Sequence, residues 1–386
     1  MDKIFTASLS NPDTNVYVTL ELPADPYAVM DAWERLRPAP DTRVVWDIED
    51  YGEFPILFHS TQPGKDFPAA NALAERLAGL DDRQRTAFNG LVKLAGKRME
   101  IDALMTLAEQ ARHCHVVPEA TDDAQLGRFY AVNGFIPEVV DVPDQVFELL
   151  DFGLLGRRTR LAEGGVFTRQ GYVVPDGAWQ PTQGREPPAA PEPPTGIFRL
   201  ELCHKEQQAG LTLPAADREL IAALEELGAK GFQSCSVTSF HSRVPQIPAE
   251  WAVPERMDVL NRLAQRLAVL AEQDPPALIK YKAVLEASPP SSLEGALALT
   301  ERLDAYSLDR SAVTPGDVAH SELYCAMGAE EAGLLEPYVS LHRYGEALIQ
   351  QYGGQLTDYG LLTRADRQPV QGPLPPRPRL GGMEMR

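Results

Sequence analysis

Two short stretches hold the side chains that metal binding or nucleophilic catalysis uses. His113-Cys114-His115 places a thiol between two imidazoles, and residues 234–242 (SCSVTSFHS) place serine, threonine and cysteine close to His241. A zinc site draws its ligands from separated positions at characteristic spacing, and the nearest further pair, Cys203-His204, does not supply that spacing. Alternating serine and threonine are typical of the polar face of a β-strand. We therefore expect no metal site and no catalytic residue in either stretch.

The motifs that identify common enzyme classes are missing from the sequence. It contains no GxSxG elbow, P-loop, GxGxxG fingerprint or HExxH helix, and residues 63–66 (PGKD) lack the glycine spacing that cradles a phosphate. The sequence thus favours a protein that binds rather than catalyses, and we expect no cofactor. An enzyme that uses His241 or residues 113–115 remains a possibility, which bound metal or turnover would reveal.

Negative charge is the largest signal in the composition. The chain has 55 Asp and Glu against 36 Lys and Arg, a net charge of −19 over 386 residues. Residues 99–156 hold eleven acids and two bases, and a second acidic group lies among the aromatic residues of WDIEDYGEF at 46–54. From these groups we take the candidate partner-binding carboxylates, which are Asp47, Glu49, Asp50, Glu53, Asp102, Glu109, Glu119, Asp122, Asp123, Glu138, Asp141, Asp144, Glu148 and Asp151.

A surface of this charge repels the phosphate backbone, so direct binding to nucleic acid is not expected. One interpretation of the acids is a solvated face that keeps the protein soluble. The other is that they imitate a polyanion. Duplex DNA carries one charge about every 1.7 Å of its axis, so nineteen charges correspond to roughly 32 Å, or about ten base pairs.

Three blocks of sequence recur in the same order at nearly one offset. Residues 71–80 (NALAERLAGL) align on 261–270 (NRLAQRLAVL) with seven identities in ten, and 101–110 fall on 293–302. Residues 164–171 and 353–360 both read GGxxTxxG. These blocks predict a tandem duplication.

The predicted domains follow from this repeat. Copy one spans residues 1–173 and copy two spans residues 196–366. Between them, residues 174–195 contain seven prolines, which is typical of a semi-rigid spacer, and residues 367–386 are expected to be a disordered, proline-rich tail.

The expected elements are the same in both copies. Alternating stretches at 3–10, 15–22, 42–51, 197–204 and 232–240 predict strands, and 25–36 and 215–228 predict short amphipathic helices. Leucines at 73, 77 and 80, and again at 263, 267 and 270, predict helices packed in a bundle, and the stripe Leu220, Ile221, Leu224 and Leu227 is expected in the core. The fold class is therefore α+β, with two tandem copies of an elongated module whose small antiparallel β-sheets flank a helical bundle.

Residues 149–173 (LLDFGLLGRRTRLAEGGVFTRQGYV) combine acid, aromatic, arginine and glycine residues in one segment. We expect its glycines to form a turn before a short strand. Its arginines, Arg157, Arg158 and Arg160, are expected to neutralise neighbouring acids rather than to contact nucleic acid.

This segment resembles the C-terminal part of the ArdA antirestriction proteins, in which an acidic, aromatic D-Y/F-x-x-x-G-R element precedes a charged helix, a glycine turn and GY. The residues that fit this pattern are Asp151, Phe152, Gly156, Arg157, Gly165, Gly171 and Tyr172. Residues 46–54 also look like the acidic D-x-E-D-Y stretch of the family. In copy two, Ser340 stands at the position of Asp151 and Glu346 at that of Arg157, so the resemblance is strongest over residues 1–173.

The resemblance implies an acidic protein of a mobile genetic element such as a plasmid or conjugative transposon. It implies that the carboxylates mimic DNA and occupy the DNA-binding groove of a type I restriction-modification enzyme, which they inhibit. The partner is then a DNA-binding protein complex. The family's homodimers imply either a homodimer or a pseudo-dimer formed by the two copies of one chain.

The alternative function is a protein-binding or regulatory module of a mobile element that does not mimic DNA and has no catalytic activity. We expect a cytoplasmic protein without membrane association. The N-terminal residues lack the apolar core of a signal peptide, and no apolar run approaches the roughly 18–20 residues of a membrane span. The four cysteines are scattered along the sequence, which is typical of proteins whose thiols stay reduced.

Overall fold

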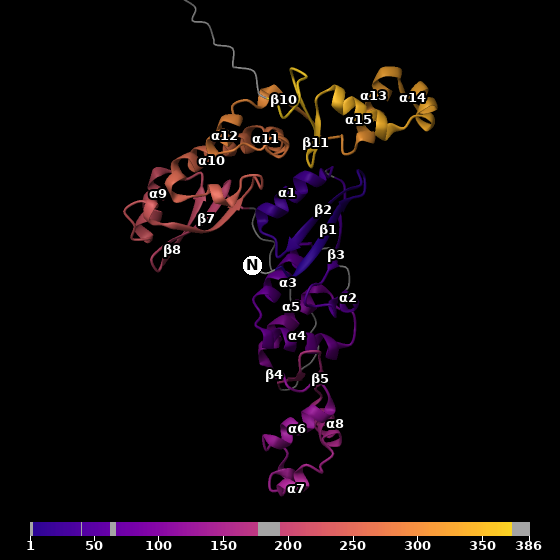
Figure 1. Cartoon of the computed structure of the whole chain (residues 1–386), viewed down its shortest axis with the longest axis vertical. Coiled ribbons are helices and arrows are strands. Elements are labelled where there is room, and N and C mark those ends of the chain that lie inside the picture. The colour runs from indigo at the N-terminus through magenta and orange to yellow at the C-terminus, as the bar shows by residue number, and fades with distance from the viewer. Residues whose placement is uncertain (1–2, 40, 62–66, 177–193, 373–386) are drawn as a thin grey trace, which may run out of the picture. The chain divides into compact units, whose positions relative to one another are not determined.

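The computed structural model describes residues 3–39, 41–61, 67–176 and 194–372 of the chain. These residues form fifteen α-helices and four antiparallel sheets of three strands each (Figure 1). The predicted α+β class, with small antiparallel sheets and helices, is confirmed. Among the described helices, none combines the length and the apolar composition that a membrane span requires.

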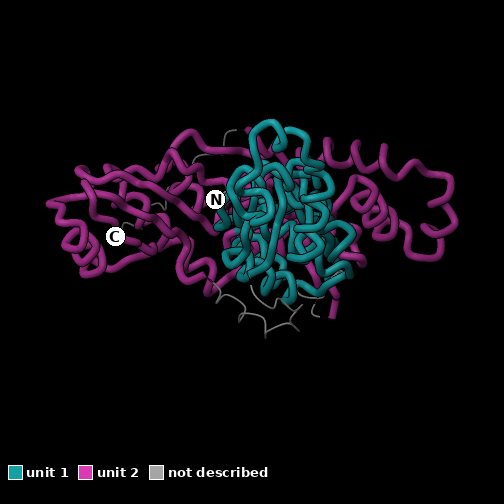
Figure 2. Tube along the Cα trace, turned by 90° about the horizontal axis from the view of Figure 1, so that it is seen from below, with its two compact units in different colours: residues 1–10, 17–24, 44–192 teal, residues 11–16, 25–43, 193–386 magenta. Residues whose placement is uncertain are grey.

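The chain divides into two units that interleave in sequence (Figure 2). Unit 1 consists of residues 1–10, 17–24 and 44–192, and unit 2 consists of residues 11–16, 25–43 and 193–386. The predicted boundary at 174–195 thus separates most residues of unit 1 from most residues of unit 2. It differs from the structure because two segments that precede that boundary belong to unit 2, residues 11–16 and residues 25–43, and the second contains helix α1 (Pro26–Leu36).

Unit 1 begins with a sheet in the order β2-β1-β3, followed by a helical bundle. Its elements are β1 (Phe5–Asn11), β2 (Val16–Leu22), β3 (Val45–Asp50), α2 (Leu57–Ser60), α3 (Phe67–Ala78), α4 (Asp82–Ala95) and α5 (Ile101–Gln110). Strand β1 alternates buried and half-buried residues, as its sequence predicts. Leu73 and Leu77 on α3 are buried, which confirms the predicted bundle face.

The second part of unit 1 is a sheet in the order β4-β6-β5 with a helical lobe inserted between two of its strands. The elements are β4 (Cys114–Val117), α6 (Asp123–Val132), α7 (Asp144–Phe147), α8 (Phe152–Glu163), β5 (Val166–Phe167) and β6 (Tyr172–Pro175). We call residues 119–163 the α6–α8 lobe. Within unit 1, the first sheet, the bundle, the second sheet and the α6–α8 lobe follow one another (Figure 1).

Two glycines allow helices α6 and α8 to cross at backbone contact. A Cβ atom on Gly127 would lie 1.9 Å from the carbonyl oxygen of Phe152, and one on Gly156 would lie 1.8 Å from the carbonyl oxygen of Asp123. Neither position can hold a side chain unless the helices separate. The glycine of the predicted D-F-x-x-x-G element is therefore required by packing.

Unit 2 has the same kinds of element. In addition to α1 it contains β7 (Phe198–His204), β8 (Gln207–Leu213), α9 (Asp217–Glu226), β9 (Ser236–Ser242), α10 (Met257–Gln273), α11 (Pro275–Ala287), α12 (Leu293–Leu299), β10 (Tyr306–Asp309), α13 (Pro315–Met327), α14 (Ala329–Leu335), α15 (Leu341–Gln351), β11 (Gln355–Thr357) and β12 (Gly360–Arg364). Its sheets have the orders β8-β7-β9 and β10-β12-β11. One large core joins the first of these sheets to helices α10, α11 and α12.

Apart from α2, which has no α-helical counterpart between β9 and α10, the elements of residues 5–175 and 198–364 therefore run in the same order, and the four sheets form two matching pairs. Individual hydrogen bonds match as well. The side chain of Asn71 accepts from the Ala24 backbone N–H (2.7 Å) and donates to its carbonyl (2.9 Å), and Asn261 makes the same two bonds with Ala215 (both 2.9 Å). This correspondence agrees with a repeated module, although the duplication itself stays a prediction.

The same match extends to the GGxxTxxG turns. Gly164 and Gly353 adopt positive φ and precede short strands, as predicted. The hydroxyl groups of Thr168 and Thr357 each donate to the carbonyl of the glycine three residues later, at 2.9 Å. Each turn is thereby fixed by one side chain.

The structure corrects several local expectations. Strand β6 runs to Pro175, which lies within the predicted spacer, and residues 177–193 of that spacer lie outside the described residues. Residues 367–372 of the predicted disordered tail are described, with Val370 buried and its N–H bonded to the carbonyl of Gly353. The predicted core residue Ile221 is 55% exposed, and strand β8 was not expected because its glycine and glutamines weaken the strand pattern.

We predict that Gly156→Ala destabilises the α6–α8 lobe by about 1–3 kcal/mol or more, because overpacking at the helix crossing forces the backbones apart. Gly153→Ala is the matched control on the same helix, since its Cβ would meet only Asp151 Oδ1, at 3.3 Å. Urea unfolding followed by circular dichroism measures both. Equal stability of the two variants would contradict the close crossing.

Candidate functional site

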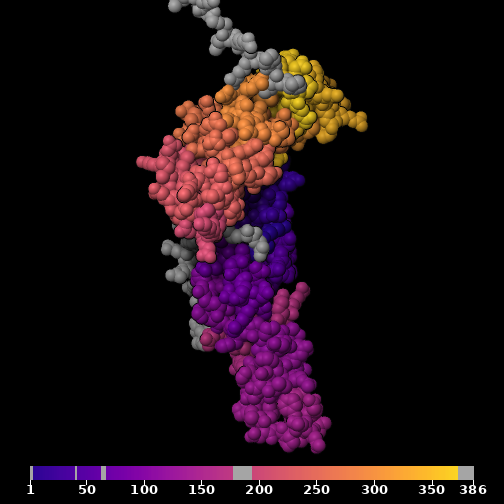
Figure 3. All heavy atoms as spheres, turned by 60° about the vertical axis from the view of Figure 1, so that its left-hand side comes forward, coloured from indigo at the N-terminus to yellow at the C-terminus, as the bar shows by residue number. Residues whose placement is uncertain are grey.

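All fourteen predicted carboxylates lie in unit 1, where eleven are exposed and three, Asp102, Glu109 and Asp123, are half-buried. Three lie on strand β3, one lies in the turn after it, and two lie on α5. The remaining eight belong to the α6–α8 lobe and are Glu119, Asp122, Asp123, Glu138, Asp141, Asp144, Glu148 and Asp151. The lobe therefore concentrates the predicted site, and Figure 3 shows it as the end of the unit 1 column beyond the bundle.

Five of the fourteen carboxylates form ion pairs with arginines of the same unit. The pairs are Glu53–Arg85 (2.6 Å), Glu109–Arg76 (2.8 Å), Asp123–Arg160 (2.8 Å), Glu138–Arg158 (2.9 Å) and Glu148–Arg128 (3.5 Å). The expectation that the arginines of 149–173 neutralise nearby acids is confirmed for Arg158 and Arg160. These five carboxylates contribute less to an external negative field than their number suggests.

The pair of Asp123 and Arg160 is the best formed of these. Arg160 donates from Nε and Nη2 to both carboxylate oxygens, at 2.8 and 3.2 Å, and its guanidinium lies over the ring of Phe167. These hydrogen bonds, with the charge of the arginine, hold the pKa of Asp123 below its usual range. Asp123 therefore ties α6 to α8 and is a structural residue rather than a free charge.

A second group of carboxylates caps backbone N–H groups. Asp122 accepts from Gln125 at the start of α6, Asp151 accepts from Leu154 at the start of α8, and Asp50 accepts from Gly52. A cap satisfies an otherwise unpaired donor and places its negative charge at the positive end of a helix, but the charge stays at the surface. These acids serve both the fold and the surface potential.

The remaining free charges define the core of the candidate site. Within the described residues, Glu49, Glu119, Asp141 and Asp144 form neither an ion pair nor a side-chain hydrogen bond, and all four are exposed. Three of them lie in the α6–α8 lobe. These carboxylates can accept hydrogen bonds from a cationic partner without first giving up an internal contact.

Apolar side chains are exposed on the same lobe. They are Val132, Phe135, Val140, Val146, Leu149, Leu154 and Leu161, with exposures from 48% to 82%. Exposed apolar residues that occur close together mark surfaces that bind other molecules. The α6–α8 lobe thus offers a mixed surface, acidic and apolar, that the sequence did not reveal because its helices were expected to bury their apolar residues.

Residues 113–115, which combine a thiol and two imidazoles, lie at the start of strand β4 and just before it. Cys114 is buried on β4, and burial raises the pKa of its thiol to about 11, so that it stays protonated. His113 and His115 are exposed. Among the described residues there is no group of three or more His, Cys, Asp or Glu arranged to hold a metal ion.

In unit 2, Ser239, His241 and Asp25 form a chain of contacts. Ser239 Oγ lies 2.9 Å from His241 Nε2, and His241 Nδ1 lies 3.3 Å from Asp25 Oδ2. The order of groups matches a catalytic triad, and Asp25 also caps helix α1 by accepting from Tyr27 and Ala28. We interpret the chain as a link between the start of α1 and strand β9.

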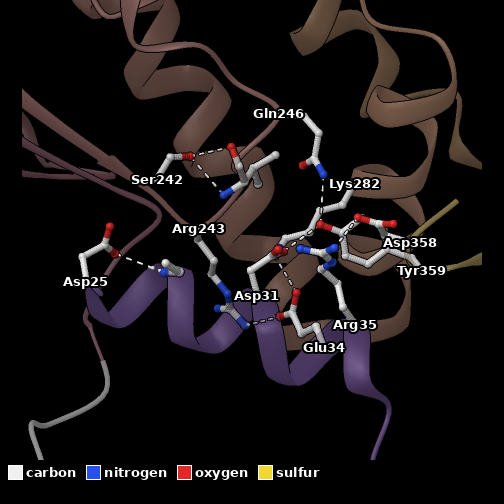
Figure 4. A network of polar contacts seen from close by, with 12 residues as sticks. Asp25, Asp31, Glu34, Arg35, Ser242, Arg243, Gln246, Lys282, Asp358 and Tyr359 are labelled. Atoms are coloured by element: carbon white, nitrogen blue, oxygen red, sulfur yellow. Dashed lines mark hydrogen bonds and ion pairs between the residues drawn. The ribbon is translucent and has the colours of Figure 1, made fainter. Parts of the chain in front are cut away.

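Helix α1 is held in unit 2 by a buried ionic cluster that the sequence analysis missed (Figure 4). The ammonium group of Lys282 on α11, which is fully buried, donates to Asp31 at 2.7 Å and to Glu34 at 2.5 Å. Tyr359 also donates to Asp31, at 2.7 Å, and burial together with this carboxylate raises the pKa of its phenol. One feature of the sequence could have revealed this cluster, because Lys282 lies in a helix that has apolar residues on every side.

Arginines add further contacts between α1 and the rest of unit 2. We call the unit 2 residues that surround α1 the seat of α1. Arg35 forms an ion pair with Asp358 at 2.5 Å, and Arg37 donates to the carbonyl oxygens of Arg310 (2.6 Å) and Asp358 (2.8 Å). Arg310 donates in turn to the carbonyl of Glu34, at 2.7 Å. Burial lowers the pKa of both Arg37 and Arg310. The seat is therefore polar and specific for one helix.

The sequence matches no protein-family model and no curated protein sequence. The function is therefore argued from the residues and their surroundings.

We predict that Lys282→Met destabilises unit 2 by about 3–5 kcal/mol, because it leaves the carboxylate of Asp31 buried without its counter-charge. Lys280→Met, two residues earlier on the same helix, is the control, since Lys280 bonds only the carbonyl of Tyr306 and is half-buried. Urea unfolding measures the loss, and limited proteolysis between residues 25 and 43 reports release of α1. An unfolding midpoint equal to that of Lys280→Met would contradict the cluster's role.

Proposed function

We propose that this protein is an acidic inhibitor of a type I restriction-modification enzyme, which it binds in the cytoplasm by presenting carboxylates where the enzyme expects DNA phosphates. The observation that carries the proposal is the set of exposed carboxylates in unit 1 that have no internal ion pair, concentrated in the α6–α8 lobe. The protein acts by occupying the groove and has no catalytic role. This proposal also rests on the resemblance of residues 149–173 to the ArdA antirestriction proteins.

The electrostatics of the lobe support such binding. Residues 119–163 carry nine acids and four bases, a net charge of −5, and one of the four bases, Arg128, pairs with Glu148 at 3.5 Å. A DNA-binding groove is lined with Lys and Arg, which are attracted by a dense negative surface and release counterions when they bind it. The complementary charges speed association and select against partners that lack a basic groove.

The structure also supports a reduced form of mimicry. Arginines neutralise five of the fourteen carboxylates, so the remaining field comes from the free acids and the helix caps. All fourteen candidate carboxylates, including the free ones, lie in unit 1. We therefore assign inhibition to unit 1.

The second candidate is a module that binds a protein partner without mimicking DNA. The observation that favours it is the exposed apolar set on the α6–α8 lobe, in which Leu149 is 82% exposed. Such side chains contribute about 25 cal/mol for each Å² that a partner covers, and this contribution does not depend on salt. The two candidates share a surface and differ in which side chains hold the partner.

We predict that combining Glu119→Gln, Asp141→Asn and Asp144→Asn weakens inhibition of a type I restriction-modification enzyme by at least about tenfold, since exposed charge-assisted contacts contribute roughly 0.5 kcal/mol or more each. The fold should stay intact because none of the three groups has an internal partner among the described residues. DNA cleavage with titrated inhibitor provides the measurement.

The matched control neutralises three exposed acids of unit 2, with Glu206→Gln, Glu250→Gln and Asp304→Asn. It removes the same net charge and should leave inhibition within about twofold. If the two triple variants inhibit equally, net charge rather than a defined surface is responsible, and the assignment to unit 1 fails.

A separate variant tests the second candidate. Leu149→Ser with Leu154→Ser removes two exposed apolar side chains of the lobe and no charge. We expect little loss of inhibition, below about threefold, because these groups are not part of the phosphate-like surface. A loss greater than that of the carboxylate variant would favour apolar binding over DNA mimicry.

A further inference from the structure

Unit 1 contains a hollow whose lining holds two bases, one acid (Glu53) and one histidine, although the unit as a whole is acidic. Its volume is about 840 Å³, and it lies between α4, the segment after β3 and the turn that joins β5 to β6. Lys93, Arg169 and His59 line it, and the side-chain oxygen of Asn89, also in the lining, is buried without a hydrogen-bond partner in the described part of the chain.

This hollow lies at the place in unit 1 that corresponds to the seat of α1 in unit 2. Helices α4 and α11 begin at equivalent caps, Asp81 and Asp274, whose carboxylates accept from N–H groups of the first turn. Counting from these caps, Asn89 falls at the position of Lys282. The hollow is thus centred on the residue that replaces the buried lysine.

The turns that border the two places correspond as well. Thr168 and Thr357, which fix the turns with the same hydrogen bond, bring Arg169 to the position of Asp358. In unit 2 this position forms the ion pair with Arg35 of the seated helix. In unit 1 the residue has the opposite charge.

The helix that corresponds to α1 is α9. The matching asparagine bonds align residue 24 with residue 215, and the left-handed residues that follow the two helices, Arg37 and Gly228, lie at the same offset. On this alignment Arg35 corresponds to Glu226. The ion pair between Arg35 and Asp358 therefore has its counterpart in Glu226 and Arg169, with both signs exchanged.

Helix α9 has the properties of an unoccupied partner helix. It carries Asp217, Glu219, Glu225 and Glu226 against Arg218, all exposed, so that its charge of −3 complements the two bases of the hollow. Ile221, at the position of Met30 of α1, is 55% exposed. In unit 2 the helix leaves these side chains at the surface.

We propose that the hollow of unit 1 binds helix α9 of a second copy of this chain, in the manner in which unit 2 holds α1. The contact pairs Arg169 with Glu226 and places the exposed face of α9 over Asn89. Because each chain offers one hollow and one α9, the contact is heterologous and joins chains head to tail, which gives rings or open assemblies according to the angle. This inference does not depend on the inhibitory function.

Charge reversal on each side tests the proposal with the full chain. At low salt, the wild-type protein should show association that grows with concentration in sedimentation velocity. Arg169→Glu alone and Glu226→Arg alone should each weaken it at least about tenfold, because like charges then meet. An equimolar mixture of the two variants should associate again, since every contact between one variant and the other pairs opposite charges, whereas contacts between two copies of the same variant pair like charges.

The mixture separates a second copy from an intramolecular contact. If α9 filled the hollow of its own chain, only the double variant Arg169→Glu/Glu226→Arg would restore the contact, and mixing the single variants would change nothing. Arg157→Glu and Glu206→Arg, which reverse exposed charges elsewhere, are the controls and should not affect association. A single-chain mass for the wild type at all concentrations, or a mixture that stays unassociated, overturns the proposal.

Discussion

An ammonium group that is buried away from water needs carboxylates in contact with it. At Lys282 this requirement explains why helix α1, which provides the carboxylates, belongs to unit 2. The ammonium group is fully buried, so its loss of hydration is costly unless opposite charges lie in contact. Asp31 and Glu34 provide these charges, and both come from a helix near the start of the chain. Unit 2 is consequently complete only with residues 25–43, and the two units interleave in sequence.

The acids of the chain fall into physically distinct classes. Asp31 and Asp123 are held by cations and have structural roles, whereas Asp122 and Asp151 cap helices and remain charged at the surface. Asp141 and Asp144 have neither role. Since like charges repel across the α6–α8 lobe, retaining free acids there opposes folding, and the arginines of α8 offset part of that repulsion. The free acids are therefore the ones that the proposed function uses.

The sequence predicted those parts of the fold that depend on local periodicity. Leu73 and Leu77 lie in the bundle because a spacing of three to four residues places them on one face, and β1 alternates as its residues do. Ile221 shows the limit of this reasoning, because a periodic apolar residue is exposed when the rest of the chain provides nothing to cover it. The asparagine, glycine and threonine positions that match between the halves became informative only when their hydrogen bonds were known.

The candidate site was predictable in position but not in detail. Clustering of acids in residues 99–156 identified the α6–α8 lobe, yet the sequence could not show that Asp123 pairs with Arg160, some 37 residues away, while Asp141 stays free. Lys282 was missed for the same reason, as its partners lie about 250 residues earlier in the chain. Charge composition reports how many acids exist, and only tertiary contacts report which of them are available.

Competition with DNA tests the central claim most directly. A labelled duplex bound to a type I restriction-modification enzyme is displaced by the protein at increasing salt, and fluorescence anisotropy gives the apparent affinity. If the free carboxylates replace phosphates, affinity should fall on the order of 100-fold between about 50 and about 200 mM salt, as expected for roughly four ionic contacts. An affinity of the protein that does not change with salt, after correction for the affinity of the duplex at the same salt, or no displacement at all, would contradict DNA mimicry.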